Sequence, residues 1–240
     1  MLFQTSLRRP PAPKRKKPRK AGRHALREKL IAMITSGKFA PGAKLVQFQL
    51  AKKFGVSMSL IREAILDLQA YGLVETDDNR GFFVRRFDAK ALLDLIDVRE
   101  VLEGLAARKA CGHVTTEQAA TLEKLIEEMC ACVASGHHEQ RAELDRMFHD
   151  RIAEISGNHS VVAVTRQCSL FGKVVWTEAD ATHIRHAHTL LLDAIRHNRP
   201  DEAERVARAH VQDVKRRVEQ RLEAGGAGVY WLGVPADVPL

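Results

Sequence analysis

Apolar residues recur every three to four positions through the C-terminal two thirds of the chain, which is the period of an amphipathic α-helix. Between residues 88 and 222 this period is interrupted at about five places, most of them marked by glycine, asparagine or proline. The pattern predicts six helices, near residues 89–111, 115–135, 139–156, 158–176, 178–197 and 201–222. Because short connections favour antiparallel neighbours, this part is predicted to be an antiparallel all-α bundle of six helices.

Residues 24–87 have a different pattern of apolar and polar positions, which predicts three short helices followed by two short strands. Helices are predicted over residues 24–36 and 45–54, and a third begins at Ser59, its predicted N-cap. The apolar positions expected to be buried in the second and third helices are Leu45, Phe48, Leu50, Ala51, Ile61, Ala64, Ile65 and Leu68. A glycine-containing turn joins these two helices, and the strands flank turn residues 77–81. The fold class is therefore mostly α, with an N-terminal winged helix-turn-helix whose wing is a small β-hairpin.

The positive charge is concentrated at the start of the chain. The formal net charge is +8, yet residues 1–23 carry nine lysines and arginines and no acid, so the other 217 residues sum to −1. Four prolines in this segment oppose the amphipathic helix of a mitochondrial transit peptide, so we predict a disordered basic arm. Any affinity for a polyanion therefore belongs to the N-terminal third of the chain.

The composition argues against several classes of protein. No stretch reaches the roughly 18–20 consecutive apolar residues that span a membrane, and no signal-peptide core is present, so a cytoplasmic protein is expected. The cysteines lack a CxxC pair and are interpreted as buried thiols: Cys111, Cys130, Cys132 and Cys168. Aromatic residues make up only 5% of the chain, which argues against a sugar-binding groove. Residues 223–240 are predicted to be a C-terminal tail or a strap packed on the body.

The predicted helix-turn-helix carries residue types that contact DNA. The N-terminal turn of its second helix can enter the major groove, where Ser57, Ser59 and Arg62 reach base edges or phosphates. Further cations beside this turn are predicted phosphate partners: Lys52, Lys53, Arg80, Arg85 and Arg86. The alternative is a structural role in which Arg62 only pairs with Glu63 or Asp67, because helix-turn-helix spacing is common among helical proteins.

One carboxylate and several histidines have a spacing that brings them together in the predicted bundle. Asp145 and His149 are four residues apart and therefore share one face of a helix. His188 and His210 each lie eleven residues from Arg199, which falls in the turn between two helices, so they are expected at the same height across a helical hairpin. One carboxylate and three imidazoles inside a bundle suit a divalent transition metal such as zinc, nickel or iron.

Coincidence is the alternative interpretation of this metal site. Eleven histidines are spread along the chain, and an isolated Asp145/His149 pair is more often a surface or capping pair. His183 and His186 lie on the same predicted helix as His188 and could take its place.

A run of short motifs extends along residues 24–87. The motifs are Pro41-Gly42-x-x-Leu45, Leu50-Ala51-x-x-Phe54-Gly55-Val56-Ser57, Arg62-Glu63-Ala64, Gly72-Leu73-Val74 and Arg80-Gly81-x-Phe83-Val84. They resemble the winged-helix domain of GntR-family transcription regulators. This resemblance implies a homodimer that binds a short inverted repeat of double-stranded DNA, with Arg62 on the DNA and with Gly81 letting the wing approach the backbone. Met58 and Leu60 depart from the arginine and proline usual in the family, so the operator sequence does not follow from the resemblance.

Residues 88–222 carry a second set of motifs. These are Asp97-Val98-Arg99-x-x-Leu102-Glu103, Leu144-Asp145-x-x-Phe148-His149, Ser156-Gly157-Asn158, His188-x-x-Leu191 and His210-Val211. They resemble the ligand-binding FCD domain of the FadR-type branch of the same family, and six helices resemble the shorter VanR-like subgroup. The resemblance implies a divalent metal, zinc in the first instance, held by Asp145, His149, His188 and His210. It also implies a small carboxylate effector on that metal, with Arg99 nearby.

Together these patterns predict a ligand-responsive transcription regulator, most simply a repressor released by a small organic acid, and not an enzyme. A metal-dependent hydrolase is the alternative from another class, because three histidines and a carboxylate can activate water. Against it, His149 is not part of an HExxH helix and no general base has motif support. A regulator whose metal is only structural, or is itself the signal, is the third possibility.

Overall fold

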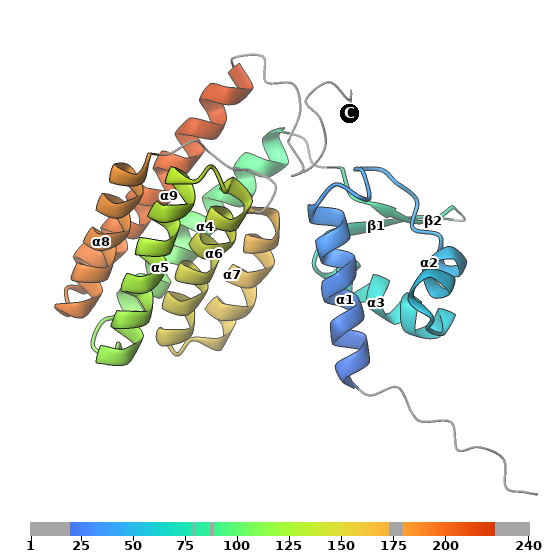
Figure 1. Cartoon of the computed structure of the whole chain (residues 1–240), viewed down its shortest axis with the longest axis horizontal. Helices are drawn as coiled ribbons and strands as arrows, with labels where there is room; N and C mark the ends of the chain where they lie inside the picture. The colour runs from blue at the N-terminus through green and yellow to red at the C-terminus, as the bar shows by residue number, and fades with distance from the viewer. Residues whose placement is uncertain (1–19, 79, 87–88, 173–179, 224–240) are drawn as a thin grey trace, which may run out of the picture.

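A computed structural model describes residues 20–78, 80–86, 89–172 and 180–223 (Figure 1). The first part contains α1 (Lys20–Thr35), α2 (Gln47–Phe54), α3 (Met58–Ala70), β1 (Val74–Asp77) and β2 (Gly81–Val84). The second contains α4 (Ala89–Ala110), α5 (Thr116–Ala134), α6 (His138–Ile155), α7 (His159–Gly172), α8 (Ala181–Arg196) and α9 (Pro200–Glu223). A winged helix-turn-helix followed by six helices confirms the predicted fold class. The predictions for residues 1–19, for the end of the fourth bundle helix and for residues 224–240 fall outside the described residues.

The first helix begins earlier than predicted. α1 starts at Lys20, so the last four residues assigned to a disordered arm are helical and that boundary was wrong. The reason lies in a distant contact: the Arg23 guanidinium binds the Asp67 carboxylate on α3, with Nε donating to Oδ2 at 2.8 Å. This pair fixes the first turns of α1, which follow Pro18, the last proline of the segment.

The helix-turn-helix forms around a tight turn between α2 and α3. Gly55 adopts the left-handed conformation, with φ 63°, and its N–H donates to the Ala51 carbonyl to end α2. Ser57 is the N-cap of α3, since its hydroxyl oxygen accepts from the Leu60 N–H at 3.2 Å. The prediction of Ser59 as the N-cap was therefore wrong by two residues.

The core of this part is formed by the apolar faces of α1 and α3. Leu30, Ile34, Ile61, Ile65 and Leu68 are fully buried, and most of the predicted core positions lie with them in one apolar cluster.

Phe48 is the exception among the predicted core positions, because 65% of its surface is exposed. Leu50 and Ala51 set the buried face of α2. Phe48 precedes Leu50 by two residues and therefore points about 200° away from it around the helix.

The wing is a two-stranded antiparallel hairpin. β1 pairs with β2 in a register that sets Val74 opposite Val84 and Asp77 opposite Gly81. The turn ends at Gly81, whose φ of 104° is a backbone conformation that residues with a side chain rarely adopt. Val84 is buried and so anchors the hairpin on the helix-turn-helix.

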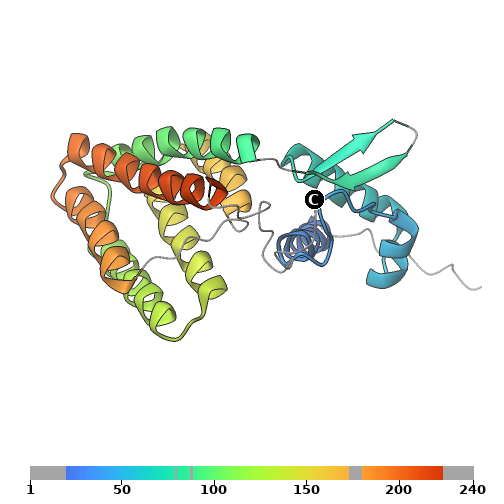
Figure 2. The ribbon, with the colours of Figure 1, turned by 90° about the horizontal axis from the view of Figure 1, so that it is seen from above.

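The second part is a bundle in which α4 and α9 lie side by side (Figures 1 and 2). Sequence signals define its helix ends: Thr115 and Gln118 form a capping box at the start of α5. Asn198, with φ 52°, and Pro200 turn the chain from α8 into α9. The four cysteines are buried and free, as predicted. No helix among the described residues is long and apolar enough to cross a membrane.

The two parts share apolar contacts along α4 and α9. Leu92 and Ile96 near the start of α4, together with Val211 and Val218 of α9, belong to the same buried cluster as the core of the helix-turn-helix. In addition, the Gln167 amide on α7 donates to the Ala70 carbonyl at the end of α3 at 3.3 Å. A change in the packing of α4 against α9 therefore acts on the same apolar cluster that holds the DNA-reading helices.

Candidate functional site

The four residues singled out as metal ligands converge inside the bundle. α6 supplies Asp145 and His149 from adjacent turns, α8 supplies His188 and α9 supplies His210. One ligand atom from each residue lies within 4.8 Å of the others. The structure therefore brings together the complete predicted set.

The helical hairpin of α8 and α9 places two of these histidines level with each other, as their equal distance from Arg199 predicts. The ring centroids of His188 and His210 are 4.8 Å apart. The two competing histidines of α8 lie elsewhere, because His183 pairs with Asp213 at 3.1 Å and His186 is exposed. The alternative in which one of them replaces His188 is wrong.

One ring nitrogen of His188 contacts a backbone carbonyl, and the other faces the Asp145 carboxylate. Nδ1 lies 2.8 Å from the Ile184 carbonyl oxygen, which can only accept, so Nδ1 carries the proton. A neutral ring then presents the lone pair of Nε2 to Asp145 Oδ1, 3.1 Å away. Two acceptors at this distance repel each other unless a proton or a cation lies between them.

His149 and His210 present two further nitrogens to the same space. The Nε2 atoms of both rings are buried and have no hydrogen-bond partner among the described residues. The two rings stack with centroids 5.1 Å apart, and Phe148 packs edge-on against His149 and His188. Buried polar atoms in proteins are nearly always partnered, so these two nitrogens point to a ligand that binds between them.

In the absence of metal, the electrostatics of the cluster favour the metal-binding forms of Asp145 and His210 but not that of His149. Burial lowers the pKa of His149, but the charge of Glu103 outweighs it and raises that pKa overall. Burial raises the pKa of Asp145, but the contact with His188 Nε2 and the charge of His149 outweigh it and hold that pKa well below its usual range. Burial, together with the charges of His188 and His149, lowers the pKa of His210 to about 3. Asp145 is therefore ionised and His210 neutral, as metal ligands must be.

The donor set fits a divalent transition metal. Four ligands held tetrahedrally at zinc–ligand distances of about 2.0–2.2 Å lie roughly 3.3–3.6 Å from one another. The ligand atoms here lie within 4.8 Å of one another, so metal binding would draw the four side chains closer together around the ion. Imidazole nitrogen and carboxylate oxygen are the donors that zinc, nickel and iron accept.

Arg99 on α4 lies beside this cluster. Its Nε donates to Glu103 Oε1 at 2.7 Å, and its side chain is largely buried. Burial lowers the pKa of Arg99, but the charges of Glu103 and Asp145 outweigh it and raise that pKa overall. Arg99 is thus a buried, permanently charged group within electrostatic reach of a predicted metal ligand.

Glu103 belongs to the FCD-like motif that begins at Asp97, but no role in the site was predicted for it. Its carboxylate is 4% exposed, and Oε2 lies 3.0 Å from His149 Nδ1. Burial raises the pKa of Glu103, but the charges of Arg99 and His149 outweigh it and hold that pKa well below its usual range. Beside that motif, its spacing of four residues from Arg99 is a sequence signal, and it predicts an ion pair with Arg99, not a contact with His149.

The residues predicted to read DNA lie on the exposed side of the helix-turn-helix. Ser57, Ser59 and Arg62 are exposed at the N-terminal end of α3. Arg62 has no ion-pair partner among the described residues, whereas Asp67 is occupied by Arg23. The structural alternative for Arg62, a simple pair with Glu63 or Asp67, is therefore wrong.

The cations that flank α3 differ in the contacts that they make within the protein. Lys52 and Lys53 are exposed in the last turn of α2. Arg80 at the wing donates to Asp77 at 2.8 Å and lies over the Phe83 ring at 5.6 Å, so it is already held in place at the turn. A methyl group added at Gly81 would meet only the Lys44 side chain, at 3.6 Å, so the positive φ is what requires glycine there.

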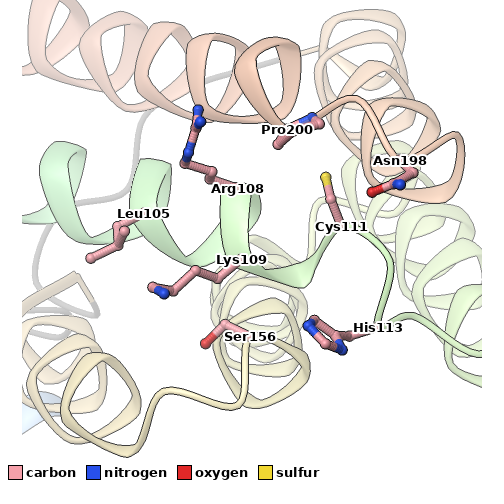
Figure 3. Close-up of a pocket in the computed structure, with 8 residues that line it drawn as sticks. All are labelled: Leu105, Arg108, Lys109, Cys111, His113, Ser156, Asn198 and Pro200. Atoms are coloured by element: carbon pink, nitrogen blue, oxygen red, sulfur yellow. The ribbon is translucent and has the colours of Figure 1, made fainter.

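A separate pocket of about 460 Å³ lies near the C-terminal end of α4 (Figure 3). Its lining consists of Leu105, Arg108, Lys109, Cys111, His113, Ser156, Asn198 and Pro200. Arg108 already pairs with Asp201 and Glu204 there. None of the predicted site residues lines this pocket, so it is distinct from the histidine cluster.

Comparison with known proteins agrees with this arrangement. Residues 23–84 match the family described as bacterial regulatory proteins, gntR family, and residues 94–213 match the FCD domain. The Nta operon transcriptional regulator of Aminobacter aminovorans is 31% identical over 186 residues, covering 75% of this chain and 86% of that protein. The Glc operon transcriptional activator of Escherichia coli (strain K12) is 27% identical over 243 residues, covering 89% and 94%.

Among solved structures, E. coli McbR/YncC has the same fold, with a TM-score of 0.70 at 21% identity over 83% of this chain and 98% of that one. The family and the relatives are transcriptional regulators, so the metal-dependent hydrolase alternative is wrong. The chain belongs to the bacterial regulatory proteins of the gntR family, with a winged helix-turn-helix followed by an FCD domain.

Proposed function

We propose that this protein is a homodimeric repressor that a small carboxylate, bound at a metal in the helical domain, releases from its operator. Residues 24–87 are the DNA-reading domain and residues 88–222 the effector domain of this proposal. The observation that carries it is the convergence of Asp145 and three histidines around two buried, unpartnered imidazole nitrogens. Because its target is DNA, the protein acts in the cytoplasm.

The metal in this proposal is zinc, held by Asp145, His149, His188 and His210. Bound there, zinc would supply a positive charge that attracts a carboxylate, whose oxygen could be accepted if the ion expands beyond its four protein ligands. Nickel and iron are the other metals that this donor set accepts. Arg99 is the protein's own cation beside that site, and it suits the second oxygen of a carboxylate.

The effector signal has a physical route to DNA. The ligand set spans three helices, and Arg99 and His210 lie on α4 and α9. The same two helices contribute Leu92, Ile96 and Val218 to the apolar cluster that contains the core of the helix-turn-helix. An effector that prefers one packing of α4 against α9 therefore shifts the placement of the two winged helices of the dimer and lowers operator affinity.

The DNA-binding part of the proposal follows from the exposed face of α3. In a dimer two such faces bind an inverted repeat, with Arg62 on base edges and Lys52, Lys53, Arg80 and the Gly81 turn on phosphates. Selecting the bound sequences from a pool of random duplexes tests the operator preference directly. The mass of the protein–DNA complex in solution tests the dimer. A monomer without preference among duplexes contradicts it, and so does a protein that retains no metal after dialysis.

We predict that the basic arm adds affinity without sequence information. Residues 1–19 carry seven lysines and arginines, whereas Arg23 is already paired with Asp67. Each cation that reaches a phosphate adds about 0.9 to the slope of log affinity against log salt. Deleting residues 1–19 should flatten this slope and leave the selected operator unchanged, as measured by fluorescence anisotropy. A changed operator would instead mean that the arm reads a groove.

Two exposed apolar side chains predict a preference for thymine. Phe48 is 65% exposed and Met58 51% exposed, in the first turns of α2 and α3. The methyl group of thymine is the apolar group that a base pair presents in the major groove. Replacing operator thymines beside the Arg62 contact by deoxyuridine removes only that methyl group, and it should weaken binding several-fold.

The Phe48→Ala/Met58→Ala double variant should not distinguish thymine from deoxyuridine. Leu190→Ala is the matched control, because Leu190 is 42% exposed but lies on α8; this variant should remain sensitive. Equal affinity of the wild type for the two duplexes would contradict the prediction.

A further inference from the structure

Glu103 contacts two residues to which the proposed function gives different partners: Arg99 binds the effector carboxylate and His149 binds the metal. Its Oε1 accepts from Arg99 Nε at 2.7 Å, and its Oε2 lies 3.0 Å from His149 Nδ1. Arg99 and Glu103 are one turn apart on α4, whereas His149 lies on α6. A single buried carboxylate therefore bridges α4 and α6 and links Arg99 to His149.

We propose that Glu103 is a positioning residue that orients His149 for the metal and couples it to Arg99. This inference rests on the proposed function, since it takes His149 as a metal ligand and Arg99 as the partner of the effector carboxylate. Glu103 itself is neither a metal ligand nor an effector contact in this account.

The contact with Glu103 determines the orientation of the His149 ring. The Nδ1–Oε2 pair is an ion-pair contact at 3.0 Å and not an aligned hydrogen bond, since Oε2 has no hydrogen-bond partner among the described residues. A carboxylate oxygen this close repels a nitrogen lone pair, so the proton belongs on Nδ1 and the lone pair on Nε2. Nε2 is the atom that is buried without a partner among the described residues. A carboxylate behind a metal-binding histidine fixes the ring and makes it a stronger ligand, and losing such a partner typically costs about 10- to 100-fold in metal affinity.

Arg99 and His149 compete for the charge of the same carboxylate. Glu103 shares its negative charge between the Arg99 guanidinium and the His149 ring, both of which contact it directly. An effector carboxylate that engages Arg99 competes with Glu103 for this guanidinium. Glu103 then interacts more strongly with His149, so effector and metal strengthen each other's binding, as linkage requires.

Cobalt binding to the full-length dimeric protein tests this, because the affinity and visible spectrum of bound cobalt are readouts independent of DNA binding. Glu103→Gln keeps the size of the side chain and removes its charge. We expect this variant to bind cobalt about 10- to 100-fold more weakly than the wild type, with a shifted spectrum. Glu100→Gln is the matched control: Glu100 lies on the same helix but contacts Arg208 and Gln212, and cobalt affinity should not change.

A second variant separates coupling from simple damage to the fold. Arg99→Gln removes the competing cation and leaves Glu103 to His149 alone, so cobalt should bind more tightly than in the wild type. Opposite changes in the two variants support the inference, whereas weaker binding in both would reduce Glu103 to a structural ion-pair partner and overturn it. Wild-type affinity in Glu103→Gln would also overturn it. Failure of the wild type to bind cobalt would instead refute the proposed metal site.

Discussion

The His188→Ala protein should lose its metal while still binding operator DNA. His188 is 2% exposed, and its Nε2 lies 3.1 Å from Asp145 Oδ1, so its removal breaks the ligand set at the centre. Losing a partner behind a ligand typically costs about 10- to 100-fold in metal affinity, so losing the ligand itself should cost more than about 100-fold. Mass spectrometry after dialysis measures the metal content of the variant. The response of operator affinity to carboxylates should disappear together with the metal.

His186→Ala is the control for this experiment. His186 lies two residues away on α8 and is exposed, so its loss removes a histidine without touching the cluster. It should retain full metal content and full response to carboxylates. Equal metal content in His188→Ala and wild type would contradict the ligand assignment.

Arg62→Ala should weaken or relax operator recognition by about 1–3 kcal/mol, which is the value of one good contact to a base edge. Arg62 is exposed on α3 and has no ion-pair partner among the described residues, so the substitution removes no stabilising pair. Competition between the selected operator and variants with single base changes measures the effect. The loss of preference should be confined to the positions that Arg62 reads.

Arg205→Ala provides the matched control, since Arg205 is an exposed arginine on α9 with only a distant contact to Glu202, at 4.0 Å. Removing it changes the net charge equally and should leave the sequence preference intact. A uniform loss of affinity for all duplexes in Arg62→Ala would show that Arg62 contacts a phosphate and not a base.

Helix positions and the four ligand positions could be predicted because they depend on local spacing. An apolar period defines the face of each helix, and two antiparallel helices keep positions equidistant from their turn at one level, as with His188 and His210. The helix-turn-helix core follows the same rule. Local spacing gives each pair by itself, whereas the meeting of the Asp145/His149 pair with the His188/His210 pair was supported by the resemblance to the FCD domain.

The wrong predictions and the missed site residue lie where contacts between distant residues, or the choice between two faces of a helix, determine the structure. α1 starts at Lys20 because Arg23 meets Asp67, 44 residues later in the chain. Glu103 contacts His149 across two helices, and no local pattern gives that pairing. Phe48 lies in a helix of eight residues, in which the apolar period is too short to choose between two faces.

The most direct test of the whole account is operator affinity measured by anisotropy, with zinc-loaded and zinc-stripped protein, across a panel of small carboxylates. We predict that at least one carboxylate lowers the affinity of the zinc-loaded protein, and that none affects the stripped protein or the Arg99→Gln variant. If zinc alone changes operator affinity and no carboxylate adds to it, the metal is itself the signal. If neither zinc nor any carboxylate changes operator affinity, the metal is only structural, and either outcome contradicts a carboxylate-responsive regulator.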